Sequence, residues 1–300
     1  MDRCNIFTVE GGKDKFAEMV RVRALYNEKQ KEIENSIQNA KVEIKKADGL
    51  ISQTVNELAT SFLMRRSKKE SKYAFIEKLK KEKEAANAQI EELEEKISEL
   101  RKETFGTTEL PKLCFGRYPY KADGSEELVE WDVIRVKGDR ALLLSVNIID
   151  RMRYADELEN TAWKDCRIRR WTNGYFYENA FSDVERDMIL ETEIANPGNT
   201  TYKTAASTNT RDFIFIPSVN DAYRFYNFDQ DRIAVATEYA ASKGIYINEE
   251  TKGSYWWLRS NGGNMYNAST VNFEGYVFEY GFYVNNKEIG VRPALWISLA

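Results

Sequence analysis

Histidine is absent from the 300-residue sequence, and cysteine and proline are scarce, with three and five residues. Without histidine, the chain lacks the commonest general base and the commonest metal ligand. The three cysteines, Cys4, Cys114 and Cys166, form no CxxC motif, and their number is odd. The sequence therefore predicts no disulfide framework and favours folding in a reducing compartment.

Long apolar segments are missing as well. No window approaches the ~18 apolar residues of a membrane span, and the N-terminus MDRCNIFTVEGGKDKF lacks the apolar stretch of a signal peptide. We expect no membrane span and cytoplasmic synthesis without a signal peptide, with association with a virion as an alternative destination. The formal net charge of −4 lacks the basic surplus of nucleic-acid binders, so no nucleic-acid partner is expected.

Composition divides the chain into two regions. All six tryptophans and 31 of the 38 aromatic residues lie after residue 105. Residues 13–104 contain no proline and few aromatics, but many Glu, Lys, Gln and Ala. This shift predicts an N-terminal tail at 1–12, a coiled-coil stalk at 13–104, a linker at 105–112 and a second domain at 113–300.

The stalk region shows heptad order. Apolar residues recur at steps of three and four, with one step of seven in each stretch: Ile33, Ile37, Ala40, Ile44, Ala47, Ile51, Leu58 and Phe62, then Ile76, Leu79, Ala86, Ile90, Leu93, Ile97 and Leu100. Lys83 is the polar residue of the second stretch. Such a seam must be covered by another helix, so we expect a homo-oligomer formed through a coiled coil. The basic run at 65–72 contains no Gly or Pro. Its composition favours one continuous helix over a hairpin of two helices.

Residues after 112 mix strand and helix signals. Positions 129–136 alternate between apolar and polar residues, as a half-buried strand does. Helices are expected around 171–192, 218–225 and 234–243, with a capping box of Ser182 and Glu185 and with Gly244 as a C-cap. The predicted fold class is α+β.

The segment 264–288 is crowded with Tyr, Phe and Asn. Five small anchors, Val271, Gly275, Val277, Gly281 and Val284, recur through it, and glycine permits the tight turns and bulges between short strands. Tyr and Asn together supply rigid area and adaptable hydrogen bonding, as binding loops do. An alternative is that some of these rings belong to the core. The predicted ligand-binding residues are Asn264, Tyr266, Asn267, Asn272, Phe273, Tyr276, Phe278, Tyr280, Phe282, Tyr283, Asn285 and Asn286.

A family resemblance rests on several motifs in order. FGRYP at 115–119, RRWTNGYFYENAFS at 169–182, WWLRS at 256–260 and GVRPALWI at 290–297 resemble a C-type-lectin-like domain family of unknown function from gut bacteria and their phages. The resemblance extends from about residue 113 to the C-terminus and implies a C-type-lectin-like domain preceded by the coiled coil. Some members are variable proteins of diversity-generating retroelements, in which a reverse transcriptase rewrites adenine-rich codons. By resemblance, 264–288 is the diversified segment and the five anchors are its unvaried scaffold.

The sequence lacks the residues that the enzymes and calcium-dependent lectins of this fold require. The same fold resembles that of formylglycine-generating oxidases, which use a cysteine pair, but no cysteine follows Cys166. The Glu-Pro-Asn and Gln-Pro-Asp triplets of calcium-dependent lectins are absent too. We therefore expect no enzyme activity, no cofactor and no metal, and a protein or cell-surface ligand as partner. The alternatives are a structural coiled-coil protein with a lectin-like cap, and calcium-independent carbohydrate binding.

Overall fold

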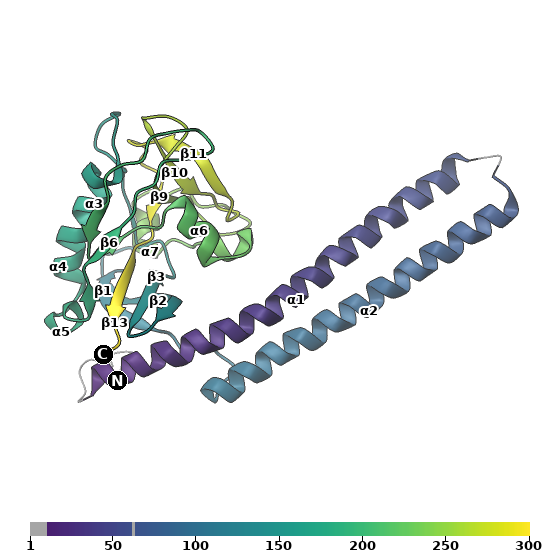
Figure 1. Ribbon diagram of the computed structural model, residues 1–300, viewed down its shortest axis with the longest axis horizontal. Helices are drawn as coiled ribbons and strands as arrows, with labels where there is room; N and C mark the ends of the chain where they lie inside the picture. Colours follow the sequence, from purple (N-terminus) through teal and green to yellow (C-terminus); the bar gives the residue numbers. More distant parts are fainter. Residues whose placement is uncertain (1–10, 62–63) are drawn as a thin grey trace. The chain divides into compact units, whose positions relative to one another are not determined.

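The computed structural model describes residues 11–61 and 64–300 (Figure 1). The fold is α+β, with two long helices followed by a curled, mainly antiparallel β-sheet region. Its contacts define two compact units, the helical unit Leu25–Pro111 and a globular unit that joins residues up to Ala24 with Lys112–Ala300. Most of the expected tail 1–12, together with Cys4 and the seam residue Phe62, lies outside the described residues.

The elements follow in chain order. The helices are α1 (Gly12–Thr60), α2 (Arg66–Phe105), η2 (Trp163–Asp165), α3 (Arg167–Trp171), η3 (Thr172–Phe176), α4 (Tyr177–Ala180), α5 (Asp183–Arg186), α6 (Val219–Phe225), η4 (Asp229–Arg232) and α7 (Glu238–Ser242). The strands are β1 (Cys114–Pro119), β2 (Glu126–Lys137), β3 (Arg140–Ser145), β4 (Asp150–Arg151), β5 (Ile189–Leu190), β6 (Thr192–Ile194), β7 (Thr210–Asp212), β8 (Ile214–Phe215), β9 (Trp256–Asn261), β10 (Asn267–Val271), β11 (Val277–Tyr283), β12 (Gly290–Val291) and β13 (Ala294–Ser298).

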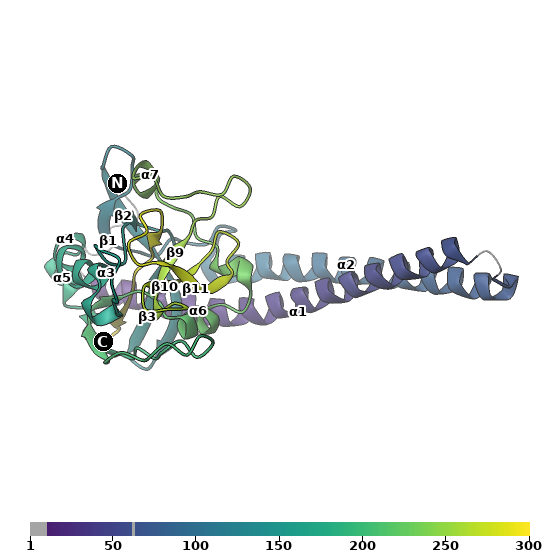
Figure 2. The same ribbon diagram turned by 90° about the horizontal axis from the view of Figure 1, so that it is seen from above.

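The helical unit is an antiparallel pair formed by most of α1 and by α2 (Figure 1; Figure 2). Lys83, the polar residue of the heptad seam, forms an ion pair with Asp48 of the opposite helix. The prediction of one continuous helix is therefore wrong, because α1 ends at Thr60 and α2 returns along it. The reversal lets the two seams cover each other within one chain, and it buries Ile37, Ala40, Ala47, Ile76 and Leu79.

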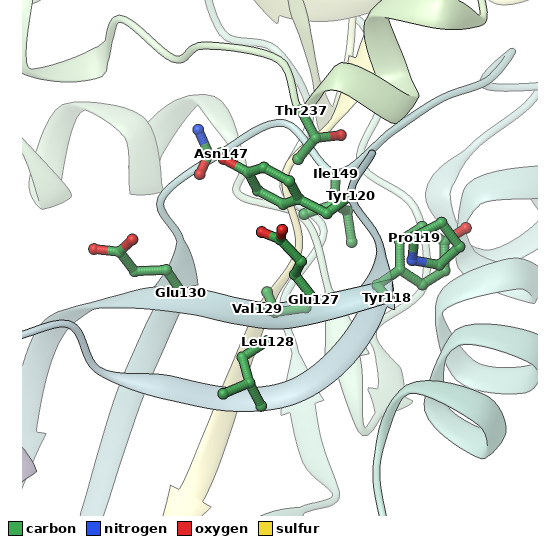
Figure 3. A pocket seen from close by; sticks show the side chains of 10 residues that line it. All are labelled: Tyr118, Pro119, Tyr120, Glu127, Leu128, Val129, Glu130, Asn147, Ile149 and Thr237. Carbon is green, nitrogen blue, oxygen red and sulfur yellow. The ribbon is translucent and has the colours of Figure 1, made fainter. Parts of the chain in front are cut away.

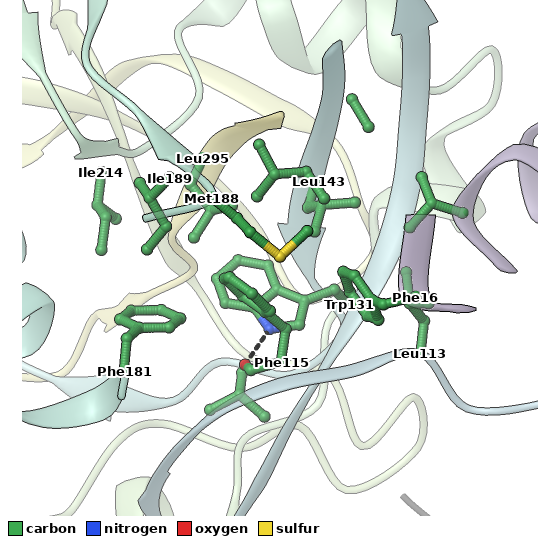
Figure 4. Packing of buried hydrophobic residues seen from close by; sticks show 14 of the residues in the cluster. Phe16, Leu113, Phe115, Trp131, Leu143, Phe181, Met188, Ile189, Ile214 and Leu295 are labelled. Atoms are coloured by element: carbon green, nitrogen blue, oxygen red, sulfur yellow. Dashed lines mark hydrogen bonds between the residues drawn. The ribbon is translucent and has the colours of Figure 1, made fainter. Parts of the chain in front are cut away.

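The first turns of α1 belong to the globular unit. Phe16 and Val20, four residues apart on one helix face, are both fully buried. The ring of Phe16 stacks on Phe115 with its centroid 5.4 Å away (Figure 4). Residues 13–24, expected as the start of the stalk, are thus grouped with the globular unit. The reason is that this helical segment supplies apolar side chains to the sheet core.

Two larger sheets form the globular unit within the described residues. The six-stranded sheet has the strand order β1-β2-β3-β13-β5, with β8 also paired to β13. The five-stranded sheet, which we call the smaller sheet, has the order β11-β10-β9-β12-β4. Strand β2 shows the predicted alternation, since Val129, Trp131 and Val133 are buried. The Trp131 indole donates a hydrogen bond of 2.7 Å to the Phe115 carbonyl (Figure 4). The core of this sheet thus lies between its central strands and the flanking helices.

Local capping signals match the sequence. Ser182 and Glu185 form the predicted capping box of α5, and Gly244 has a φ of +82° shortly after α7 ends. Helix α6 begins after a second box of Ser218 and Asp221. Among the described residues, no helix combines the length and hydrophobicity that crossing a bilayer requires.

Candidate functional site

The segment predicted to bind ligand forms the outer hairpin of the smaller sheet. Strand β10 pairs with β9 on one side and with β11 on the other, and β11 is the edge strand. Gly275 turns the hairpin with a φ of +82°, and Gly281 forms a bulge with a φ of +69°. A Cβ atom at Gly281 would lie 1.9 Å from the Ala268 carbonyl oxygen, so only glycine fits this close approach.

Burial separates the five anchors from the aromatic residues between them. Val271, Val277 and Val284 are at most 1% exposed, and Gly275 and Gly281 are also buried. By contrast, Phe273, Phe278 and Phe282 are half-buried. The exposed fractions of Tyr266, Tyr276, Tyr280 and Tyr283 are 42%, 55%, 43% and 59%. The hairpin therefore fills the interior with small residues and keeps its tyrosine rings at the surface.

The asparagines of this segment mainly shape its backbone. The side-chain oxygens of Asn264, Asn272 and Asn286 each accept a hydrogen bond from the backbone amide two residues later. These bonds define Asx turns, which fix the loops. Asn267 is only 5% exposed, and its Nδ2 donates to main-chain oxygens of β11. Asn267 therefore lies inside the hairpin and Asn285 is half-buried, and both stay predictions as ligand contacts.

Half-buried rings form a continuous series of contacts, which we call the aromatic ladder. Phe278 packs on Phe282 with centroids 5.5 Å apart, and Phe282 packs on Tyr255 at 5.2 Å. Tyr255 contacts Phe273 at 5.5 Å, and Tyr246 contacts both of these rings. Edge-to-face packing of this kind holds each ring in a defined orientation. The sequence pattern does not indicate Tyr246 and Tyr255, because they precede the aromatic segment and join it only in the fold.

A loop distant in sequence borders β11. The Asn199 amide donates to the main-chain oxygens of Glu279 and Asn261, at 3.1 and 3.2 Å. The oxygen of the same amide accepts from two backbone amides of its own loop. Tyr202 is thereby held against Tyr280, with ring centroids 5.4 Å apart, and remains 42% exposed. Tyr202 is a site residue that the sequence analysis missed, because the preceding Asn-Pro-Gly triplet indicates only a turn.

A separate pocket lies beside the β1–β2 hairpin (Figure 3). Its empty volume is about 260 Å³, part of it open to solvent. The enclosed part has a volume of about 10 Å³, room for about one water molecule. The pocket is lined by Tyr118, Pro119, Tyr120, Glu127, Leu128, Val129, Glu130, Asn147, Ile149 and Thr237, none of which is a predicted contact. The aromatic surface of the smaller sheet is therefore the candidate site.

The buried thiol of Cys166 has a structural role. Cys166 is fully buried, and burial raises the pKa of its thiol to about 12. Its sulfur caps α3 by accepting from the Arg169 amide. Such a thiol stays protonated near neutral pH and is a poor nucleophile.

These features define an α+β protein with a rigid, aromatic-rich surface on its smaller sheet. Residues 138–299 match the family model described as Domain of unknown function (DUF6273). Because the match spans more than half of the chain, the protein belongs to this family. Comparisons with curated proteins and with solved structures found no match.

Proposed function

We propose that this protein is a non-enzymatic recognition protein that binds a protein or cell-surface target through the aromatic surface of its smaller sheet. The observation that carries the proposal is the contrast between buried anchors and exposed tyrosines along one hairpin. Tyrosine gives a binding surface large area with little loss of side-chain entropy, and a few central rings supply most of the energy. Phe278 of the ladder packs against Tyr280, with ring centroids 6.3 Å apart, and would help to hold this ring in place before it meets a target.

The proposal includes a C-type-lectin-like fold whose segment 264–288 is diversified. Its support is that the last strand, β13, returns to the sheet that begins with β1, while β9, β10, β11 and β12 join β4 in the smaller sheet. The five positions expected to be invariant are buried, and rings between them face outward. Sequencing the neighbouring DNA tests this part. We expect a reverse transcriptase gene and a near-copy of codons 264–288 that differs only at adenines.

We also propose that the helical unit assembles copies of the chain. Apolar side chains remain uncovered on the helix pair, and we would expect a second copy to bury them. Val42, Leu50, Val55, Tyr73 and Phe75 are 41–58% exposed. Linked copies would convert weak individual contacts into avidity. A monomeric mass at every concentration in sedimentation equilibrium would contradict this part.

The binding surface is tested by replacing Tyr276, Tyr280 and Tyr283 with alanine together. The full chain is screened against a displayed library of bacterial surface proteins, and its best ligand is then measured with the variant. Because hot-spot tyrosines each contribute about 2 kcal/mol or more, we expect affinity to fall at least about a hundredfold.

The matched control is Tyr175→Ala, which removes a ring that is 58% exposed outside the aromatic surface. Its affinity should equal that of the unaltered protein. If the triple variant stays folded by near-ultraviolet circular dichroism but keeps its affinity, the proposed surface is wrong. If the triple variant unfolds, these rings are structural.

A further inference from the structure

One carboxylate on the edge strand has hydroxyl partners but no cationic one. Glu279 is half-buried, and its carboxylate accepts from the Thr201 hydroxyl at 2.6 Å and from the Tyr223 phenol at 3.2 Å. Among the described residues, no lysine or arginine forms an ion pair with it. Hydrogen bonds to neutral hydroxyls orient a carboxylate without neutralising its charge.

The nearby guanidinium of Arg232 already has partners of its own. Arg232 lies over the Tyr223 ring, 5.6 Å from its centroid, but it forms an ion pair with Asp229. It also donates a hydrogen bond of 2.8 Å to the Gly275 carbonyl, and its side chain is only 3% exposed. Arg232 therefore supports the backbone of the hairpin and does not serve as a counter-ion for Glu279.

Exposed tyrosines from separate parts of the chain lie close to this carboxylate. Tyr223 on α6 is 47% exposed. Burial and the neighbouring Glu279 carboxylate raise the pKa of Tyr223 to about 12, so the phenol remains a hydrogen-bond donor at neutral pH. On the other side, Thr201 precedes Tyr202, which packs against Tyr280.

We infer that Glu279, together with the ring of Tyr223, is an anchor site for a lysine or arginine side chain of a partner protein. A carboxylate forms its strongest hydrogen bonds with such cations, and tyrosine faces attract them further. One carboxylate is too few ligands for calcium, which takes about six to eight oxygens. The inference rests on the proposed recognition function and adds the chemistry of the group that is recognised.

The test uses a small cation on the full-length protein. Nα-acetyl-arginine amide is titrated while backbone amide shifts around Glu279 and Tyr223 are followed by NMR. Nα-acetyl-citrulline amide, a neutral isostere, is titrated in parallel. We expect saturable shifts with the arginine probe, no saturation with citrulline, and weaker binding at higher salt.

Glu279→Gln removes the charge but keeps an oxygen for one hydroxyl donor, and it should weaken arginine binding about tenfold, equivalent to about 1.4 kcal/mol. The matched control is Glu274→Gln, since Glu274 is an exposed carboxylate in the turn of the same hairpin. That variant should bind the arginine probe as the unaltered protein does.

Three results would each overturn the inference: equal binding of arginine and citrulline, equal binding by the Glu279→Gln variant, or no saturable shift with the arginine probe. The comparison of the two probes needs no variant, so it holds even if Glu279→Gln destabilises the fold. Because the probes act without the natural target, their failure leaves the triple-tyrosine experiment unaffected. Failure of the inference can therefore be distinguished from failure of the proposed function.

Discussion

Replacing Gly281 by alanine tests whether the backbone of the hairpin is the fixed part of the surface. Gly281 has a φ of +69°, and an added Cβ would lie 1.9 Å from the Ala268 oxygen and 2.5 Å from its carbon. The left-handed conformation costs a non-glycine residue about 1–2 kcal/mol. Moving two paired strands apart to relieve the contact costs about 1–3 kcal/mol more. We therefore expect Gly281→Ala to destabilise the globular unit by about 2–5 kcal/mol.

The neighbouring ring provides the comparison. Tyr280 is 43% exposed and makes an edge-on contact with Tyr202. Losing that contact should cost about 0.5–1.5 kcal/mol. If the backbone is fixed and the rings are replaceable, Tyr280→Ala must therefore be much milder than Gly281→Ala.

Urea unfolding followed by tryptophan fluorescence measures both variants. All six tryptophans lie after residue 105, so the signal reports on the globular unit and not on the helix pair. In thermal unfolding of a unit of this size, each kcal/mol of lost stability lowers the midpoint temperature by about 2–4 °C. A Gly281→Ala variant within about 0.5 kcal/mol of the unaltered protein would refute the reasoning. A Tyr280→Ala variant that loses as much stability as Gly281→Ala would refute it equally.

Two further predictions concern the globular unit. Phe16→Ala should destabilise it by about 3–5 kcal/mol in the same fluorescence assay, because the ring is fully buried against Phe115; an unchanged midpoint would mean that α1 is not anchored in the core. Burial tends to raise the pKa of the Asp221 carboxyl, but Arg259 and hydrogen bonds from Ser218 outweigh it and lower the pKa overall. A lowered folded-state pKa stabilises the fold above the unfolded value of about 4, and this stability is lost as pH falls. Asp221→Asn should therefore lower the free energy of unfolding by about 3 kcal/mol at pH 7, with a smaller decrease at pH 3, as measured by urea unfolding. A decrease that does not depend on pH would contradict this account.

Local signals in the sequence predicted local structure well. Alternation identified the buried face of β2, and the spacing of Ser182 and Glu185 identified a helix start. The recurrence of valine and glycine in 264–288 identified the buried anchors. Small residues that recur at short intervals in a hairpin indicate positions that pack in its interior. These predictions depend only on neighbours within a few residues, which a single sequence contains.

Long-range features were harder to predict. A heptad seam states that a helix needs a partner, but not whether the partner is another copy or the same chain folded back. Likewise, the spacing of Phe16 and Val20 suits a stalk as well as a core helix, so the anchoring of α1 had no local signal. The rings of Tyr202, Tyr246 and Tyr255 join the aromatic surface only because the fold brings distant loops together.

Several contacts that hold the hairpin do not involve its exposed rings. Asn199 donates to the Glu279 main-chain oxygen, Arg232 to that of Gly275, and Thr251 to that of Phe273. Each of these bonds ends on a main-chain atom, so it does not depend on which side chain the hairpin residue carries. Substituting an exposed ring therefore leaves the framework intact, whereas removing Asn199 or Arg232 would release the backbone itself. Glu279 differs in that its side chain also accepts hydrogen bonds from the hydroxyls of Thr201 and Tyr223, which lie outside the hairpin.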